Sequence, residues 1–183
     1  IRTYHTLDAD VVPPYVARPR DGTLLSGAVS SAYPLRTMLV NRYFKLPQVT
    51  YIRHPGYHMN GTCTPGFLKE LAKYKVAICT ASMYGYALRK LIEATACGCI
   101  VVTDLPEDEV LPEIDGNLVR VPSDISLVHM KILLRDLHHA YNAEKQKDFA
   151  DKAKAYYDYR VMGLRLAQQI EELRSAYNVL PNR

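Results

Sequence analysis

The sequence predicts an α/β protein with a Rossmann-like, mainly parallel five-stranded sheet, helices on both faces and a helical C-terminal segment. Two observations support this prediction. Short apolar runs of strand length alternate with segments of helical periodicity, which is the order of βαβ units. After residue 124 only helical periodicity remains. Because parallel neighbours need crossover connections, the alternation indicates a parallel sheet with right-handed crossovers.

Composition limits the classes of protein to consider. The chain has 183 residues, of which 48% are hydrophobic, and a formal net charge of +4. This is large enough for one domain with a full core and too apolar for a disordered chain. The mild positive charge suits an anionic ligand such as a nucleotide diphosphate, but does not require one. With no dense basic run and no apolar run of ~20 residues, we expect neither a nucleic-acid partner nor a membrane span.

The cysteines point to a reducing environment. The chain has four, Cys63, Cys79, Cys97 and Cys99, and none has the spacing of a zinc site. We expect buried, reduced thiols, no metal, and a cytoplasmic setting.

The first 22 residues differ from the rest. They contain Pro13, Pro14 and Pro19, end in Asp21-Gly22, and show no helical period. We expect residues 1–22 to form an extended, loosely packed leader or interdomain connection. The domain itself is then expected at residues 23–183.

The first predicted strand, residues 24–29, ends in small residues. Pro34 is then well placed to open a helix that we expect at residues 35–45. Gly27 and Ala28 would allow a ligand to approach the backbone closely, although a tight strand-to-helix turn explains them equally well. Arg36, in the first helical turn, could face a phosphate or solvent.

The second predicted strand, residues 49–52, is followed by a polar loop. This loop contains Arg53, His54 and His58. Its two histidines lie in a segment with proline and glycine rather than on one helix face, so a metal site is not favoured. A loop lining a nucleotide and a plain surface loop both remain open. A short helix at residues 65–74 and a third strand at 76–79 follow.

The stretch from residue 80 to 113 is the centre of the chain. A turn at Tyr84-Gly85-Tyr86 leads into a helix that stops at Gly98, and a fourth strand follows at 99–103. In a βαβ unit the helix begins at the carboxyl end of the first strand, where anions and nucleotides bind. The apolar stripe of this helix comprises Leu88, Leu91, Ile92, Thr95 and Ala96.

Arg89 and Glu93 lie one turn apart on a flank of that stripe. One interpretation is a surface salt bridge of little value. The other places Arg89, helped by Lys90, near a phosphate and Glu93 near ribose hydroxyls. Because Glu93 lies off the apolar stripe, we expect it in a solvated cleft, where replacement by glutamine would hardly change stability.

We expect the remaining segments to have structural roles around the central stretch. The acidic loop at residues 104–109 is expected to be solvated, with its carboxylates at the start of a short helix rather than around a cation. A fifth strand is expected at 117–121. Three helices follow, marked by apolar positions at 127–137, 149–157 and 164–177.

Residues 93–104, EATACGCIVVTD, resemble the donor-binding motif E-A-x-A-x-G-x-P-V-V of GT-B fold glycosyltransferases. The pattern is most similar to the group-1 transferases and their spore-protein-like relatives, and it covers roughly residues 20–175. The resemblance implies a C-terminal domain that binds a nucleotide-diphosphate sugar as donor substrate, with no tightly bound cofactor. It implies that Glu93 contacts the ribose. It also implies an N-terminal acceptor-binding domain, or a partner chain, beyond the leader.

Two positions depart from the motif. Gly85 stands where the commoner transferases have a glutamate that contacts the donor sugar, and Ile100 replaces the proline. The alternative is therefore a non-catalytic, degenerate transferase domain that serves binding or assembly. A receiver-like phosphate-binding domain is weaker, because no acidic triad follows the strands. The candidate nucleotide-sugar-binding residues are Gly27, Ala28, Arg53, His54, Tyr84, Gly85, Tyr86, Arg89, Lys90 and Glu93; the catalytic residue is unknown.

Overall fold

A computed structural model describes residues 3–17, 20–53 and 63–178. The strands are β1 (Thr23–Gly27), β2 (Val49–Arg53), β3 (Val76–Ile78), β4 (Ile100–Thr103) and β5 (Leu118–Arg120). The α-helices are α1 (Pro34–Val40), α2 (Cys63–Leu71), α3 (Arg89–Ala96), α4 (Leu127–His139), α5 (Ala143–Tyr157) and α6 (Tyr159–Asn178). Short 3-10 turns lie at η1 (Ala9–Val11), η2 (Tyr43–Lys45) and η3 (Asp115–Asn117).

The five strands form one parallel sheet in the order β2-β1-β3-β4-β5, which confirms the predicted fold class. The chain runs from β1 outward to β2 and then returns to place β3 on the other side of β1. Connections therefore leave β1 and β3 in opposite directions. In doubly wound sheets of this order, ligands bind in the crevice at that switch point.

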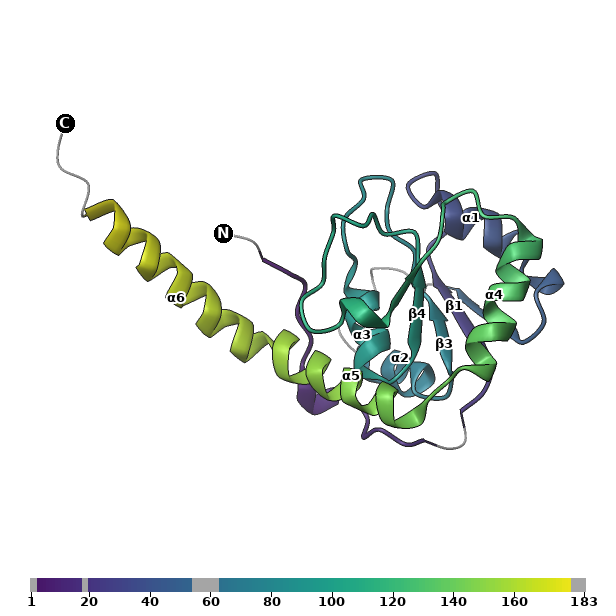
Figure 1. The fold of residues 1–183 in the computed structure, drawn as a ribbon, viewed down its shortest axis with the longest axis horizontal. Helices are drawn as coiled ribbons and strands as arrows, with labels where there is room; N and C mark the ends of the chain where they lie inside the picture. The colour runs from purple at the N-terminus through teal and green to yellow at the C-terminus, as the bar shows by residue number, and fades with distance from the viewer. Residues whose placement is uncertain (1–2, 18–19, 54–62, 179–183) are drawn as a thin grey trace.

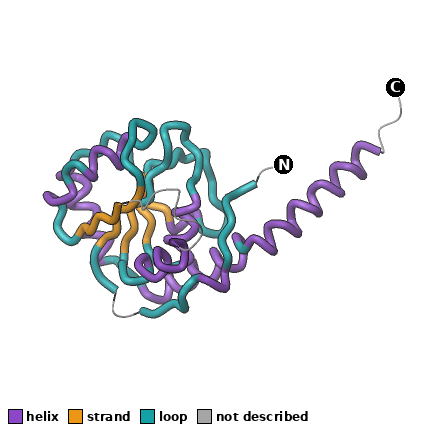
Figure 2. The backbone as a smooth tube through the Cα atoms, turned by 180° about the vertical axis from the view of Figure 1, so that it is seen from behind, coloured by secondary structure: helices purple, strands orange, loops and turns teal. Residues whose placement is uncertain are grey.

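Helices cover both faces of the sheet (Figures 1 and 2). On one face, α1 and α4 pack on Leu25, Ile78 and Val102. On the other, α2, α3 and α5 pack on Leu24 and Val101. Successive strand residues thus enter opposite cores, as the two-residue period of a strand requires.

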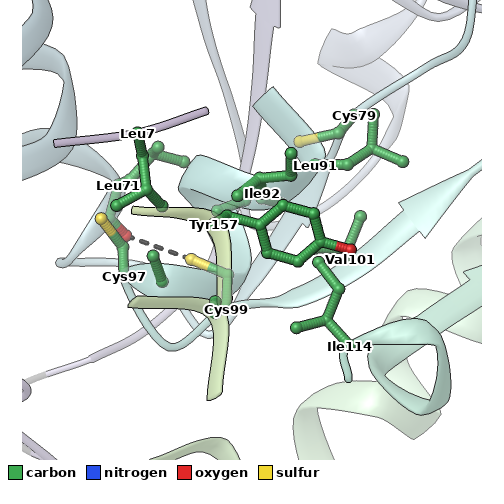
Figure 3. Packing of buried hydrophobic residues seen from close by; sticks show 14 of the residues in the cluster. Leu7, Leu71, Cys79, Leu91, Ile92, Cys97, Cys99, Val101, Ile114 and Tyr157 are labelled. Atoms are coloured by element: carbon green, nitrogen blue, oxygen red, sulfur yellow. Dashed lines mark hydrogen bonds between the residues drawn. The ribbon is translucent and has the colours of Figure 1, made fainter. Parts of the chain in front are cut away.

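The core between the sheet and helices α2, α3 and α5 contains the three buried thiols and Tyr157, which ends α5. Figure 3 shows the Tyr157 ring near Val101 and Ile114, and its hydroxyl donates to the carbonyl oxygen of Pro112 at 2.9 Å. Cys79, Cys97 and Cys99 are free and buried, as predicted, while the Cys63 side chain lies outside those described.

Two helix boundaries differ from those predicted. The helix expected at residues 35–45 ends at Val40, and a 3-10 turn completes the segment. The helix expected at 65–74 begins earlier, at Cys63, and ends at Leu71. Gly98 stops α3 as predicted, because it holds a φ of +81°, a conformation that side chains disfavour.

The leader is packed against the domain, so the expectation of loose packing is wrong. Leu7 is 2% exposed and belongs to the core. Its amide donates to the Tyr157 carbonyl, and its own carbonyl accepts from the Tyr159 amide. Further along, the Tyr15 hydroxyl donates to the carbonyl of Ala143 at 2.8 Å. Isolated apolar residues anchor this segment, which is why it has no period in the sequence.

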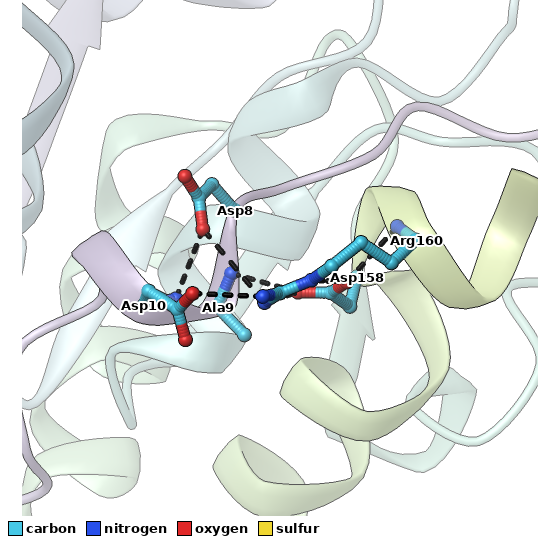
Figure 4. Close-up of polar contacts among 5 residues, drawn as sticks. All are labelled: Asp8, Ala9, Asp10, Asp158 and Arg160. Carbon is cyan, nitrogen blue, oxygen red and sulfur yellow. Dashed lines mark hydrogen bonds and ion pairs between the residues drawn. The ribbon is translucent and has the colours of Figure 1, made fainter.

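A polar cluster fastens the leader to the junction of α5 and α6 (Figure 4). Asp158 lies between α5 and α6, where its non-helical backbone separates the two helices. Its carboxylate accepts hydrogen bonds from the Arg160 guanidinium at 2.7 Å and from the Ala9 amide at 3.1 Å. The Arg160 guanidinium also bonds Asp10 at 2.8 Å. The hydrogen bonds that the Asp158 carboxylate accepts, above all from Arg160, hold its pKa well below the ordinary range. The entry of the chain is thus tied to the start of its last helix.

Helix α6 extends away from the rest of the domain (Figures 1 and 2). From residue 167 to 177 every side chain is exposed. Among the described residues, no helix is long and apolar enough to cross a membrane.

Replacing Leu7 by alanine should lower the free energy of unfolding by about 2–5 kcal/mol, because it opens a cavity in the core. The matched control is Val16→Ala in the same leader, since Val16 is exposed and should change stability by less than about 0.5 kcal/mol. Chemical denaturation of both variants measures this. Equal stability of the two would show that the leader does not belong to the folded domain.

Candidate nucleotide-binding site

The candidate site lies at the carboxyl ends of β1 and β3, on either side of the switch point. The strands end at Gly27 and Ile78. Polar side chains from β1, α1 and α3 converge there. This is the place that the topology assigns to ligands in such sheets.

Arg36 comes from the first turn of α1 and is only 3% exposed. Its Nη1 donates to the carbonyl of Ala28 at 3.1 Å, and its Nη2 donates to the carbonyl of Thr80 at 3.3 Å. The guanidinium therefore bridges the loops after β1 and β3. Its Nε is buried without a hydrogen-bond partner.

Arg36 is a buried cation that the negative charge of Asp104 compensates only from a distance. Its guanidinium lies over the Tyr33 ring at 4.0 Å, but within the described part of the chain it makes no ion pair with a carboxylate. Burial lowers the pKa of Arg36. A buried charge of this kind is costly unless it is paired, so the arrangement suits an anion supplied from outside.

Lys90 brings a second cation to the same point from α3. Its Nζ donates to the Ser26 hydroxyl at 3.3 Å and lies 5.3 Å from the Phe67 ring centroid. Burial, reinforced by the nearby charge of Arg36, lowers the pKa of Lys90 to about 8. Burial is the main cause of this shift, and the positive charge of Arg36 adds to it.

Gly27 makes room for both cations. A Cβ atom here would lie 2.7 Å from the Arg36 Nη1 and 2.9 Å from the Lys90 Nζ. The residue also has a φ of +127°, which side chains rarely adopt. The structure thus explains the glycine by close approach of the two cationic groups to the backbone.

Arg89 and Glu93 form an ion pair, with 2.8 Å between Nε and Oε1. The expected solvated position of Glu93 is wrong, because the residue is 5% exposed. Helix α3 packs against both α2 and α5, and its residues from Leu91 to Ala96 are all buried. Burial raises the pKa of the Glu93 carboxyl, and the charges of Arg89 and Lys90 oppose this rise.

The loop before α3 leaves its aromatic side chains in solvent. Tyr84 and Tyr86 are both exposed, and Gly85 between them has a φ of +69°. The N-cap of α3, Leu88, provides no side-chain hydrogen bond. An uncapped helix start that carries basic residues is favourable for an anion but not for the free domain.

The other predicted residues are placed as follows. Arg53 ends β2 opposite Gly27 in the parallel register and is exposed at the same edge of the sheet. Ala28 contributes its carbonyl oxygen to Arg36. His54 lies outside the described residues.

Two residues that hold this site, Ser26 and Thr80, were not predicted from the sequence, whereas for Arg36 the sequence left a phosphate and solvent both open. Arg36 had a signal, since it follows Pro34 by two positions in a first helical turn after a strand. Ser26 and Thr80 had none, because their contribution depends on which strands become neighbours.

In the acidic loop after β4, the first carboxylate, that of Asp104, has a structural role. Asp104 accepts a hydrogen bond from the Ala81 amide at 2.7 Å and thereby ties the β4 loop to the β3 loop. In the part of the chain that the structure covers, no group of three or more metal-ligating side chains comes together.

The parallel sheet and its two helical layers define a Rossmann-like α/β fold. No family model matches the chain, and no curated protein matches it by sequence. The likeness is visible in solved structures.

Sucrose-phosphate synthase from Thermosynechococcus elongatus is similar over 94% of this chain and 52% of its own, with a TM-score of 0.59 and 16% identity. The Anabaena protein HepE, solved in complex with UDP-glucose, is similar over 93% and 57%, with a TM-score of 0.54 and 14% identity. Both are GT-B proteins, so the predicted resemblance is confirmed at the level of the fold. This chain spans about half the length of either.

Glu93→Gln should reveal the burial of this carboxylate through pH-dependent stability. The folded pKa of Glu93 is raised above its ordinary value of 4.5, so the unfolded state releases its proton first as pH rises. Wild-type stability should therefore fall from about pH 4.5 through the folded pKa, and the glutamine variant should lack this loss. Urea midpoints between pH 4 and 8 measure the difference. If the glutamine variant lost stability relative to wild type over that range, the ion pair with Arg89 would outweigh burial.

Proposed function

We propose that this domain binds the nucleotide-diphosphate part of a nucleotide sugar, as the donor-binding half of a glycosyltransferase. One observation carries the proposal: Arg36 and Lys90 meet at Gly27, on the switch point, without a carboxylate partner among the described residues. A diphosphate supplies the missing negative charge and accepts hydrogen bonds from both cations. The exposed Arg53 at the adjacent strand end adds a third cation at this edge.

Glu93 is assigned to the ribose. Its carboxylate already accepts from Arg89, and an ionised carboxylate has capacity for further donors. Ribose hydroxyls would therefore join Arg89 around Glu93 rather than replace it. The GT-B fold and the E-A-x-A-x-G pattern support this assignment. The HepE complex with UDP-glucose supports a nucleotide sugar as the ligand class.

The contribution of this domain to catalysis is charge stabilisation of the departing diphosphate. Cations preorganised in a partly dry site stabilise developing negative charge without reorganisation at the moment of reaction. No general base is assigned to this chain. The three buried thiols support the expected reducing, cytoplasmic setting.

A second domain is proposed to complete the enzyme, with residues 1–22 as the connection to it and residues 23–183 as the donor domain. The leader runs beside the start of α6, and α6 then leaves the domain.

Large apolar side chains of α6 are exposed, namely Leu164, Ile170, Leu173 and Tyr177. Most helical stability in proteins comes from packing of an apolar face, so a partner surface along α6 is expected.

The second candidate function is a non-catalytic binding module. Gly85 favours it, because the commoner transferases have a sugar-contacting glutamate at this position. The left-handed backbone and the side chain of Pro106, 3.2 Å from a Cβ atom placed here, disfavour any side chain at residue 85. Donor-sugar contacts must then come from elsewhere, or are absent.

Replacing Glu93 by glutamine should weaken the binding of UDP, GDP or ADP, whichever binds, by roughly tenfold or more. The reason is loss of charge-assisted hydrogen bonds to the ribose, each worth about 1.5–3 kcal/mol. Isothermal titration calorimetry measures this, with Glu172→Gln on the exposed part of α6 as the control. Unchanged affinity in the Glu93 variant would exclude the ribose assignment, and no binding of any nucleotide by wild type would favour the non-catalytic module.

Nucleotide affinity should also depend on the protonation of Lys90. Since the pKa of this lysine is lowered to about 8, the positive charge is present below that pH and is lost as pH rises through it. Affinity should therefore fall by roughly tenfold between pH 7 and 10, a range over which the phosphates stay ionised. In a Lys90→Arg variant the charge persists, and the profile should be flat. A wild-type profile as flat as that of the arginine variant would place Lys90 outside the site.

A further inference from the structure

A groove runs along α4 at the amino-terminal edge of the sheet, opposite the nucleotide site. Its volume is about 700 Å³, and its walls include Pro47, Lys75, Val128, Lys131, Ile132 and Arg135. Pro47 precedes β2 and Lys75 precedes β3, so the groove lies where these strands begin. We call it the α4 groove. Nothing in the proposed donor site extends to it, because that site lies where the same strands end.

The outer face of α4 is unusually apolar. The helix buries Met130 and Leu134 against the sheet, which accounts for its inner stripe. On the other side Val128 is 67% exposed and Ile132 is 43% exposed. Four residues apart, these two side chains lie next to each other on the surface. The solvent face of a helix normally carries polar residues, so this pair suggests a covered surface.

Cations flank the apolar pair. Lys131 and Arg135 lie four residues apart on α4, and Lys75 lies across the groove. Arg135 contacts Asp136 at 3.0 Å, but both side chains are exposed, so this ion pair is weak and exchangeable. Asp21 is the one acidic residue of the groove wall.

His138 adds little positive charge to the groove at neutral pH. The His138 ring shares a hydrogen bond with the Thr23 hydroxyl at 2.8 Å and lies 3.9 Å from Asp21. Burial, with Lys75 and His139 nearby, keeps its pKa below the ordinary value. Lys75, Lys131 and Arg135 therefore outnumber the Asp21 carboxylate in the groove wall, and Asp136 beside the wall pairs with Arg135 alone in a weak, exposed ion pair.

The shape favours an elongated occupant. The groove follows α4 from Val128 to His139, a span of roughly 17 Å at 1.5 Å per residue. Three helical turns of a peptide cover that length. A bilayer prefers protruding apolar groups, whereas here Lys75 and Pro47 form an opposite wall. A peptide segment between the two walls contacts both the apolar pair and the cations.

We propose that the α4 groove docks an acidic amphipathic segment of a partner protein. Two apolar side chains of that segment, four residues apart, pack on Val128 and Ile132, and its carboxylates pair with Lys131, Arg135 and Lys75. Hydrophobic contact gives affinity, while the cations fix register and exclude basic segments. The groove and the donor site are on opposite edges of the sheet, so both can be occupied at once.

A random 16-residue peptide library displayed on phage provides the probe. Selection on the wild-type domain should enrich acidic peptides that have apolar residues four positions apart. The enriched peptides are then synthesised with a fluorophore, and their binding is measured by anisotropy. Binding should weaken at least tenfold for Lys131→Glu/Arg135→Glu and also for Ile132→Ser, and it should be unaffected by saturating UDP.

The matched control is Lys147→Glu/Lys152→Glu, which makes the same change of net charge on the exposed face of α5. This control should bind the peptides as wild type does, and thermal midpoints should show that all variants fold. The proposal is overturned if no peptide is enriched, if enriched peptides are neutral or basic, or if both double variants weaken binding equally. It is also overturned if phosphatidylserine vesicles bind the groove, with loss in Lys131→Glu/Arg135→Glu, while the peptides do not.

Discussion

The arrangement of the site depends on two cations held at one glycine. Arg36 from α1 and Lys90 from α3 approach Gly27 so closely that a side chain there would displace them, and its φ of +127° also disfavours one. Their burial opposes folding of the free domain, as the lowered pKa values of both groups indicate, and at Lys90 repulsion by the charge of Arg36 adds to this effect. The sheet order brings them together, because α1 and α3 follow the two strands that meet at the switch point. An anionic ligand relieves the repulsion that the fold imposes.

The rest of the structure keeps this edge of the sheet rigid. Arg36 bridges the loops after β1 and β3 through the carbonyls of Ala28 and Thr80. Asp104 connects the loop after β4 to the same place through the Ala81 amide. At the far side, the leader and the α5–α6 junction are joined by Asp158 and Arg160. Preorganised loops of this kind lower the entropic cost of binding.

Local sequence patterns were sufficient for the fold but only partly for the site. Alternating apolar runs predicted all five strands, because buried parallel strands read as continuous hydrophobic stretches. Gly98 and Pro34 predicted a helix end and a helix start from backbone chemistry alone. Glu93 was misjudged, since it lies on a helix that packs against α2 and α5, elements distant from it in the sequence. Leu7 was missed because a single buried leucine in an extended segment has no periodic neighbour.

The central claim is that buried cations at the switch point receive a diphosphate. Calorimetry of UDP and uridine, or the matching pair for GDP or ADP, tests it on wild type and Lys90→Met. The account predicts that the diphosphate adds at least roughly tenfold to the affinity of the nucleoside in wild type and that most of this gain disappears in the methionine variant. Equal binding of nucleoside and nucleoside diphosphate by wild type, or a gain untouched by Lys90→Met, would contradict it.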